Sequence, residues 1–161
     1  MAREQGVHQG ECNCLAVRQA ARYITQFYDQ YLVTAAGLRT TQFGILAKLK
    51  RQGPTSINAL AAQLVMDRTT LGRNVRPLQR DGLIVIEADP ADRRSRVLRL
   101  TRAGETRFER ARRAWAEAQR RFEGAYGGKQ ASELRRRLRA VVASGLGPFD
   151  QPSGGDKAAS D

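Results

Sequence analysis

The stretch from Ile57 to Ile84, "INALAAQLVMDRTTLGRNVRPLQRDGLI", decides the fold of this chain. Its first part has the periodicity of a short helix and follows Ser56, a residue type that caps helix N-termini. The buried side of this helix is expected to carry Ile57, Leu60, Ala61 and Leu64. A connector of only three residues, Val65 to Asp67, separates it from the second part.

The second part begins at Asp67, whose carboxylate suits the N-terminus of a helix. The inward positions of this helix are predicted at Leu71, Val75 and Leu78. Gly82 stands where a glycine commonly ends a helix. Two short helices joined by so tight a connector predict a helix-turn-helix, with the second helix over about residues 67–81.

The periodicity changes after this pair of helices. Residues 83–88, "LIVIEA", are rich in β-branched side chains and predict a strand. The turn "DPADRR" follows, and then "RVLRL", in which Val97 and Arg99 share one face while Leu98 and Leu100 share the other. Strand, basic turn and strand predict a β-hairpin over about residues 83–101, and a hairpin directly after a helix-turn-helix is called a wing.

Helices are predicted on both sides of this region. A first helix, within residues 12–37, has an apolar face of Ile24, Phe27, Tyr28, Tyr31 and Leu32. Thr40 or Thr41 is the expected cap of a second helix, which "RQGP" at residues 51–54 ends. Thr101 is placed to cap a long helix with a stripe of near-heptad spacing: Phe108, Ala111, Trp115, Ala118, Phe122 and Ala125. Gly127 and Gly128 interrupt it before a last helix.

The predicted fold is therefore mainly α-helical with a small β-hairpin wing. Residues 12–37 are assigned to a first helix, 38–102 to a winged helix-turn-helix region and 103–145 to the last helices, and the family resemblance given below implies dimerisation for residues 12–37 and 103–145. Residues 1–11 and the Gly/Pro/Ser-rich residues 146–161 are expected to be disordered. The near-heptad stripe favours self-association, with packing inside a single chain as its alternative.

The amino-acid composition limits the classes of partner that this protein can bind. The formal net charge is +12, which favours an anionic polymer or an anionic membrane surface. No apolar run is long enough to span a membrane, and membrane-surface binding fits poorly because the aromatic residues lie on a narrow stripe. The N-terminus lacks the apolar core of a secretory signal, and two cysteines make no disulfide framework. We expect a cytoplasmic protein.

The sequence offers no catalytic constellation. His8 is the one histidine and lies in the segment expected to be disordered, so no Ser/His/Asp or Cys/His system is available. "GLRTTQFG" lacks the spacing and the lysine of a phosphate-binding loop. Asp89 and Asp92 sit among arginines on a turn, as charge partners would. We expect no enzyme, no cofactor and no metal site outside the cysteines discussed below.

The outward side of the second helix of the pair is rich in groups that bind DNA. The candidate contact residues there are Arg68, Thr69, Thr70, Arg73, Asn74 and Arg76. Arginine bonds guanine through two atoms, asparagine does the same with adenine, and threonine offers a methyl or a hydroxyl. Gly72 leaves room for close approach to a groove wall. Pro77 predicts a kink, with base contacts confined to residues 67–74. An ordinary solvated face is the alternative.

These residues, with "DPADRRSRVLRLTRAG" after them, resemble the winged helix-turn-helix regulators of the MarR family. The hairpin motif of that family, an Asp two residues before an Arg and then Leu-Thr-x-x-Gly, is present as Asp92, Arg94, Leu100, Thr101 and Gly104. The resemblance extends from about Cys12 to Ala143, and Pro77 departs from the commonest pattern.

The resemblance implies a homodimer whose recognition helices enter successive major grooves of a pseudo-palindromic operator in double-stranded DNA. It places Arg94 in the minor groove, held by Asp92, while Arg93 and Arg96 meet phosphates or solvent. A narrow A/T-rich minor groove attracts an inserted arginine, and a carboxylate holds a guanidinium by a charge-assisted hydrogen bond. The family usually releases DNA on binding a small aromatic anion or on thiol oxidation.

Two groups of residues are candidates for that release. Phe27, Tyr28, Tyr31, Phe43 and Trp115 are predicted to line a pocket for an aromatic effector, with Arg18 or Arg22 for its carboxylate. Cys12 and Cys14 stand at the start of the first helix, where a thiol is suited to oxidation, to pairing across a dimer or to soft-metal binding. Plain core packing and inert small residues are the respective alternatives.

The function predicted from sequence is a sequence-specific transcriptional regulator, with repression favoured, that a small aromatic ligand or cysteine chemistry releases from DNA. The alternative is an architectural protein that coats DNA without an operator, which the net charge alone would support.

Overall fold

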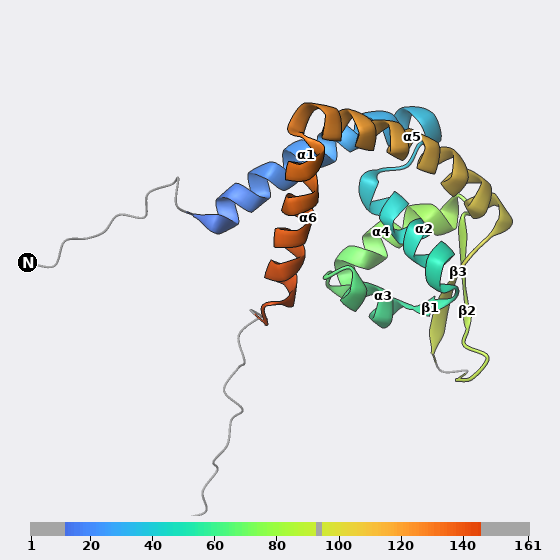
Figure 1. The fold of residues 1–161 in the computed structure, drawn as a ribbon. Helices are drawn as coiled ribbons and strands as arrows, with labels where there is room; N and C mark the ends of the chain where they lie inside the picture. The colour runs from blue at the N-terminus through green and yellow to red at the C-terminus, as the bar shows by residue number, and fades with distance from the viewer. Residues whose placement is uncertain (1–11, 93–94, 146–161) are drawn as a thin grey trace, which may run out of the picture. The chain divides into compact units, whose positions relative to one another are not determined.

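The computed structural model describes residues 12–92 and 95–145, and Figure 1 labels its helices and strands. The described chain falls into two compact units, one within Met1–Gln119 and one within Arg120–Asp161. The elements, in chain order, are α1 (Asn13–Ala36), α2 (Thr40–Gln52), β1 (Thr55–Ser56), α3 (Ile57–Gln63), α4 (Arg68–Arg80), β2 (Ile84–Ala88), β3 (Arg96–Leu100), α5 (Arg102–Tyr126) and α6 (Gly128–Ala143).

The predicted helix-turn-helix is present as α3 and α4. Ser56 Oγ accepts a hydrogen bond from Ala59 N at 3.2 Å, which caps α3 as expected. On α4 the buried residues are Leu71, Val75 and Leu78, the inward set that the spacing predicts. They join one apolar core with residues of α1, α2, β2, β3 and α5. Because this core holds one side of α4, the opposite side faces outward.

The wing is a sheet with a third strand that the sequence analysis missed. The strand order is β1-β3-β2, and both pairings are antiparallel. In the hairpin, Ile84 pairs with Leu100 and Ala88 pairs with Arg96. The added strand, β1, has only two residues, Thr55 and Ser56, so it is too short to show a period in the sequence. It ties the start of the helix-turn-helix to the wing.

The junction between the wing and α5 explains the Leu-Thr-x-x-Gly motif. Thr101 Oγ1 donates to Gly82 O at 2.7 Å and accepts from Gly104 N at 3.0 Å, so it caps α5 and closes the base of the hairpin. Gly104 lies so close to the wing that an added Cβ would stand 2.0 Å from Leu83 O. Only glycine lets the first turn of α5 approach that backbone.

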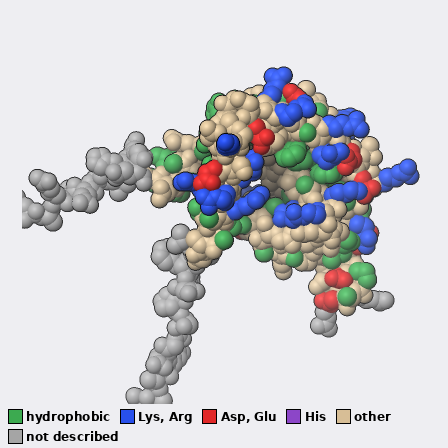
Figure 2. Space-filling model, viewed as in Figure 1, with side chains coloured by type: hydrophobic (Ala, Val, Ile, Leu, Met, Phe, Trp, Pro, Cys, Tyr) green, Lys and Arg blue, Asp and Glu red, His purple; other side chains and the backbone are tan. Residues whose placement is uncertain are grey.

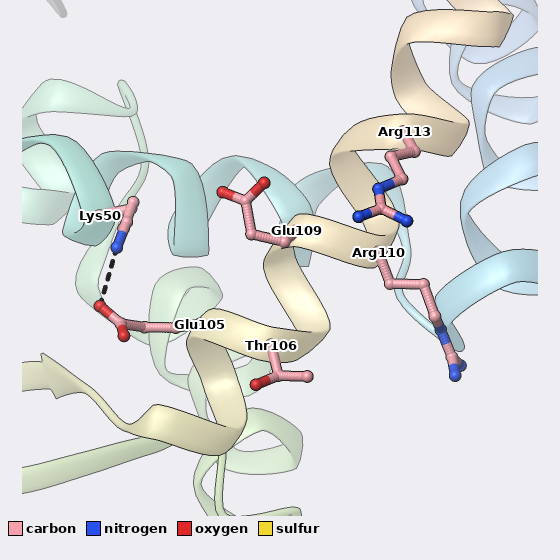
Figure 3. Close-up of a pocket in the computed structure, with 6 residues that line it drawn as sticks. All are labelled: Lys50, Glu105, Thr106, Glu109, Arg110 and Arg113. Atoms are coloured by element: carbon pink, nitrogen blue, oxygen red, sulfur yellow. Dashed lines mark hydrogen bonds and ion pairs between the residues drawn. The ribbon is translucent and has the colours of Figure 1, made fainter.

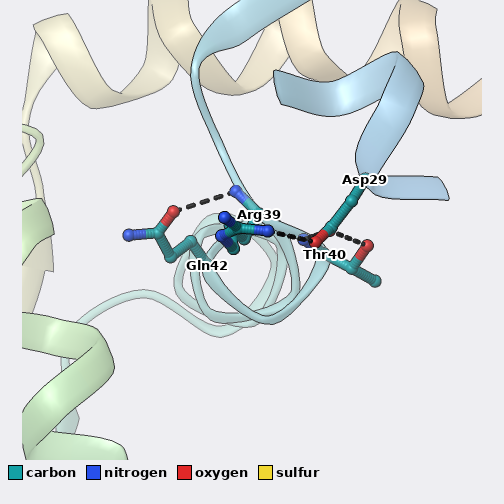
Figure 4. Close-up of polar contacts among 4 residues, drawn as sticks. All are labelled: Asp29, Arg39, Thr40 and Gln42. Carbon is teal, nitrogen blue, oxygen red and sulfur yellow. Dashed lines mark hydrogen bonds and ion pairs between the residues drawn. The ribbon is translucent and has the colours of Figure 1, made fainter. Parts of the chain in front are cut away.

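The start of α2 corrects the expected cap at Thr40 or Thr41. The helix begins at Thr40, and the acceptor for its N-terminus is Asp29, which reaches across from α1 (Figure 4). Asp29 Oδ1 accepts hydrogen bonds from Thr40 N and Thr40 Oγ1, both at 2.7 Å, and Asp29 Oδ2 pairs with Arg39 Nη1 at 3.0 Å. These contacts fix α2 to α1, and a partner eleven residues away leaves no local sequence signal.

The residues of the near-heptad stripe of α5 differ in how deeply they are buried. Phe108, Ala111 and Ala118 are buried inside the chain itself, so for them the packing alternative holds. Trp115 is 37% exposed and its ring stacks on Phe43 at a centroid distance of 6.2 Å.

The second unit contains the end of α5 and α6. Gly127, at φ 96°, separates the two helices as the Gly-Gly pair predicts. Within this unit Phe122 stacks on Tyr126, and Arg135 pairs with Glu123 at 3.0 Å. Apolar residues of α6 remain exposed: Leu138, Val141 and Val142.

We predict that Asp29→Ala lowers the free energy of unfolding by about 1–3 kcal/mol at neutral pH, since the N-terminus of α2 loses its acceptor. Burial opposes ionisation of Asp29, but the Thr40 and Arg39 hydrogen bonds outweigh it and lower the pKa of the carboxyl below its ordinary value. The stabilisation is therefore complete above the ordinary carboxyl pKa of about 4 and is lost as pH falls through the lower folded-state pKa.

Urea unfolding of both proteins from neutral to acidic pH checks this. The difference between them should shrink at acidic pH, and a difference that is the same at every pH would contradict the electrostatic part of the account.

Candidate nucleic-acid interface

Asp67 caps the N-terminus of α4, as the sequence predicts. Asp67 Oδ1 accepts from Thr70 N at 2.8 Å, and Asp67 Oδ2 accepts from Thr70 Oγ1 at 2.6 Å. The Thr70 hydroxyl and N–H stabilise the carboxylate and lower the pKa of Asp67. This double contact fixes where the outward face of α4 begins.

The candidate contact residues on α4 divide into two groups. The first group is exposed: Arg68, Thr69, Arg73 and Arg76. Within the described residues, the side-chain hydrogen bonds of this half of α4 involve Asp67, Thr70 and Asn74 and not these four. Thr70 uses its hydroxyl in the cap, and half-buried Asn74 donates from Nδ2 to Thr70 O at 2.9 Å. A two-atom contact with adenine uses Oδ1 and one N–H of the amide, and this bond engages only one of the two N–H groups, so the role of Asn74 as a base reader stays a prediction.

A shallow depression of about 450 Å³ lies on the outward face of α4. Its lining residues are Ile57, Arg68, Thr69, Gly72, Arg73 and Arg76. Every charged side chain in that lining is an arginine, so the depression favours an anionic group.

Pro77 does not end α4. The helix continues to Arg80, and Pro77 O accepts from Asp81 N at 2.9 Å. Gly82, at φ 69°, then closes the helix as predicted. Whether base contacts stop at residue 74 stays a prediction.

The wing carries the second set of candidate residues. Asp92 Oδ2 accepts from Ser95 Oγ at 2.9 Å, and Asp89 N donates to Ser95 O at 2.9 Å, which organises the turn. Arg96 is exposed, whereas Arg99 pairs with Glu87 across the hairpin at 3.1 Å. Arg93 and Arg94 lie outside the described residues, so the expected contact of Arg94 with Asp92 stays a prediction.

A second depression, of about 480 Å³, lies between α2 and α5 and differs in charge (Figure 3). Glu105 and Glu109 line it together with Lys50, Arg110 and Arg113, and Lys50 Nζ pairs with Glu105 at 2.9 Å. Carboxylates are thus interspersed with the cations here, and Figure 2 shows the same mixture of blue and red side chains along α5. The face of α4 is the more selective site for an anion.

The aromatic residues proposed for an effector pocket are partly brought together. Phe27 lies 5.4 Å from Tyr31 and 5.5 Å from Tyr28, between ring centroids, and Tyr28 Oη donates to Gln119 at 2.6 Å. Phe43 stacks between Phe108 and Trp115. Both depressions described above lie on other residues, and Arg18 and Arg22 are exposed on α1.

The two cysteines stand where the sequence analysis places them. Cys12 is the N-cap of α1, and its Sγ accepts from Leu15 N at 3.4 Å. Cys14 is exposed one residue into the helix, and both are free thiols. Within residues 12–92 and 95–145, no three His, Cys, Asp or Glu side chains gather as a metal site, and no helix is long and apolar enough to cross a membrane.

The connector between α3 and α4 holds an unfavourable backbone conformation. Val65 has φ 52°, the left-handed region that β-branched residues rarely adopt, and its side chain is 72% exposed. The residue therefore gains little from packing, and the connector is held by hydrogen bonds from Val65 N to Ala62 O at 3.2 Å and from Met66 N to Ala61 O at 2.9 Å. Sequence reasoning identified the connector but gave no sign of its strain.

Comparison with known proteins is consistent with this geometry. The sequence profile of the MarR family matches residues 36–95. A protein of Thauera aromatica, assigned as a transcriptional regulatory protein for the hcr operon, is 34% identical over 104 residues, 65% of this chain and 58% of its own length. The transcriptional activatory protein BadR of Rhodopseudomonas palustris is 36% identical over 77 residues, 45% of this chain and 43% of its own. The chain thus spans about half the length of these relatives.

A solved structure is similar over more of its length. The M. tuberculosis transcriptional regulator MosR, in complex with DNA, is 32% identical and has a TM-score of 0.71, over 84% of this chain and 100% of that chain.

We predict that Val65→Asn raises the free energy of unfolding by about 1 kcal/mol, because asparagine tolerates the left-handed region. Val65→Ala is the matched control, since it removes the β-branch but lacks the short polar side chain that lets asparagine adopt the left-handed region, and it should gain less. Urea denaturation compares the three proteins, and an Asn variant no more stable than the wild type would show that the connector is unstrained.

Proposed function

This chain belongs to the MarR family of winged helix-turn-helix transcriptional regulators, and from that membership we propose that it is a cytoplasmic homodimer that binds an operator in double-stranded DNA and represses transcription. The family is one of regulators and not of enzymes. The observation that carries the proposal is the outward face of α4, where every charged residue lining the depression is an arginine.

We propose that Thr69 and Arg73 contact base edges and so recognise the DNA sequence. Both are exposed near the capped N-terminal half of α4, the part of a recognition helix that contacts base edges. A guanidinium at Arg73 matches the two acceptors of guanine, and Thr69 offers a methyl to thymine. Arg94 and Asp92 of the wing are proposed to act together at the adjacent minor groove, because a narrow groove attracts an arginine that a carboxylate orients.

Dimerisation is supported by surfaces that each unit leaves uncovered. In α1, every residue from Asn13 to Tyr23 is exposed, and three helical turns without a partner are marginally stable in water. These turns include exposed Leu15, Val17 and Tyr23. In the second unit, α6 exposes Leu138, Val141 and Val142. A second copy of the chain would cover such surfaces and present two recognition helices to half-sites about 34–36 Å apart.

Release from DNA is proposed to follow either a small aromatic ligand among the α1, α2 and α5 aromatics or oxidation of Cys12 and Cys14. The aromatic route is supported by Phe27, Tyr31 and Trp115, which keep part of their surface exposed. Soft-metal binding by the two thiols is a further route to the same release. The direction of regulation is open to direct test, because the relative BadR is described as activatory.

The alternative, an architectural protein without an operator, is favoured only by the net charge of +12. Such a protein would bind every duplex with similar affinity at a given salt concentration. Selection of duplexes from genomic DNA, followed by titration of selected and random duplexes at one salt concentration, distinguishes the two functions. A clear preference supports a regulator, and equal affinities support the architectural alternative.

We predict that Arg73→Ala relaxes sequence preference by about 1–3 kcal/mol at one base position of the selected duplex, because one guanidinium reads one guanine. Arg112→Ala is the matched control, since it removes the same charge from the α5 surface, where Arg112 pairs with Glu109. Binding titrations against single-base variants of the duplex provide the measurement. An equal loss on all sequences would assign Arg73 to phosphate.

We also predict that mild organic hydroperoxide lowers DNA affinity through Cys12 or Cys14. One thiol would reduce the peroxide to an alcohol and become a sulfenic acid, and a second thiol would then form a disulfide with loss of water. Mass spectrometry with DNA titration, on the wild type, Cys12→Ser and Cys14→Ser, identifies the reacting sulfur. If the oxidised wild type keeps its DNA affinity, the thiols are not the release switch.

A further inference from the structure

Gly72 is a glycine that the fold does not require. It lies in the interior of α4, where glycine is about 0.8–1.0 kcal/mol less favourable than alanine. A Cβ added at Gly72 would meet no other atom within 4 Å, apart from the local helix backbone. Gly104, by contrast, is demanded by the wing backbone. The fold gives no steric reason for glycine at position 72, as it gives none at Gly44 or Gly124, and what sets Gly72 apart is its place in the arginine-lined depression.

Gly72 forms the middle of one row of residues on α4. Arg68, Gly72 and Arg76 are spaced four apart and so share one side of the helix. The missing side chain leaves a notch between the two arginines, within the depression described above. Ile57, at the start of α3, supplies an apolar wall to the same depression. Thr69 and Arg73 lie on the neighbouring row.

The chemistry of this row matches one strand of a DNA backbone. A deoxyribose is largely apolar and is flanked by two phosphates, and the row offers an apolar centre flanked by two guanidinium groups. The edge of one base can partner one of these guanidinium groups, whereas the two phosphates that flank a sugar can partner both. The position beside α3 agrees, because the first helix of a helix-turn-helix crosses the backbone.

We propose that Gly72 is a seat for the sugar–phosphate strand beside the major groove, clamped by Arg68 and Arg76, and that it sets how deeply α4 enters the groove. This rests on the proposed DNA binding and deepens it. The row Arg68–Gly72–Arg76 positions the helix without reading sequence, and the row Thr69–Arg73 reads it.

The test compares Gly72→Ala with Gly44→Ala. Gly44 lies inside α2, and an added Cβ there also meets no atom within 4 Å, so it is a matched helical glycine away from α4. Both variants should raise the melting temperature by about 2–4 °C, because both remove a glycine from a helix. Only Gly72→Ala should weaken DNA binding, by about tenfold, since a methyl would occupy the seat.

Fluorescence titrations use two labelled probes of about 30 base pairs, one of random sequence and one selected for tight binding. Gly72→Ala should lose affinity for both probes, with at least as large a loss for the selected probe because a shallower helix also weakens base contacts, and it should keep the salt dependence of the wild type because no charge changes. Arg68→Ala and Arg76→Ala should each reduce the slope of log affinity against log salt by about 1.

Several results would overturn the seat: unchanged DNA affinity of Gly72→Ala, a lower melting temperature, or a loss confined to one base position. If the wild type binds both probes equally, sequence specificity is refuted, but the comparison of Gly72→Ala with Gly44→Ala still decides the seat.

Discussion

The burial of one side of α4 is the constraint on which the proposed DNA-binding surface depends. Leu71, Val75 and Leu78 enter the common core, and this fixes the rotation of the helix about its own axis. At about 100° per residue, fixing three inward positions also fixes which side chains face outward. The arginine-lined depression is thus a consequence of hydrophobic packing on the far side of the same helix.

The surroundings of α4 set its two ends. Asp67 accepts both Thr70 donors at the start, and the Gly82 turn ends the helix where β2 begins. Thr101 then links the end of β3 to Gly82, so the wing and the end of α4 share one anchor. A small displacement of α4 in the core would accordingly move the base of the wing as well.

Local patterns made most of the fold predictable. The spacing of Leu71, Val75 and Leu78, the cap at Asp67 and the glycine at 82 are all encoded within a few residues of their effects. The missed features depend on contacts distant in sequence: Asp29 at the start of α2, and β1 paired with β3. The internal bond of Asn74 to Thr70 was missed for a different reason, since a side chain of that type is equally suited to outward display.

Three residues of the helix-turn-helix break local rules, and the helix glycines Gly44 and Gly124 do so elsewhere. Val65 has a left-handed backbone, and Gly72 and Pro77 both lie inside α4, which continues through them to Arg80. Elsewhere in the described chain the glycine at 104 has a clear structural reason, in the backbone of Leu83. Rule-breaking that the fold does not explain is expected where a surface has been shaped for binding.

The most direct test of the central claim, that two copies of α4 lie in successive major grooves, is dimethyl sulfate protection of guanine N7 on a duplex selected from genomic DNA. The account predicts two protected patches centred about 10 base pairs apart, because the half-sites of a two-fold dimer lie one helical turn apart. Protection along the whole duplex, or bound protein that leaves every guanine N7 reactive, would contradict it.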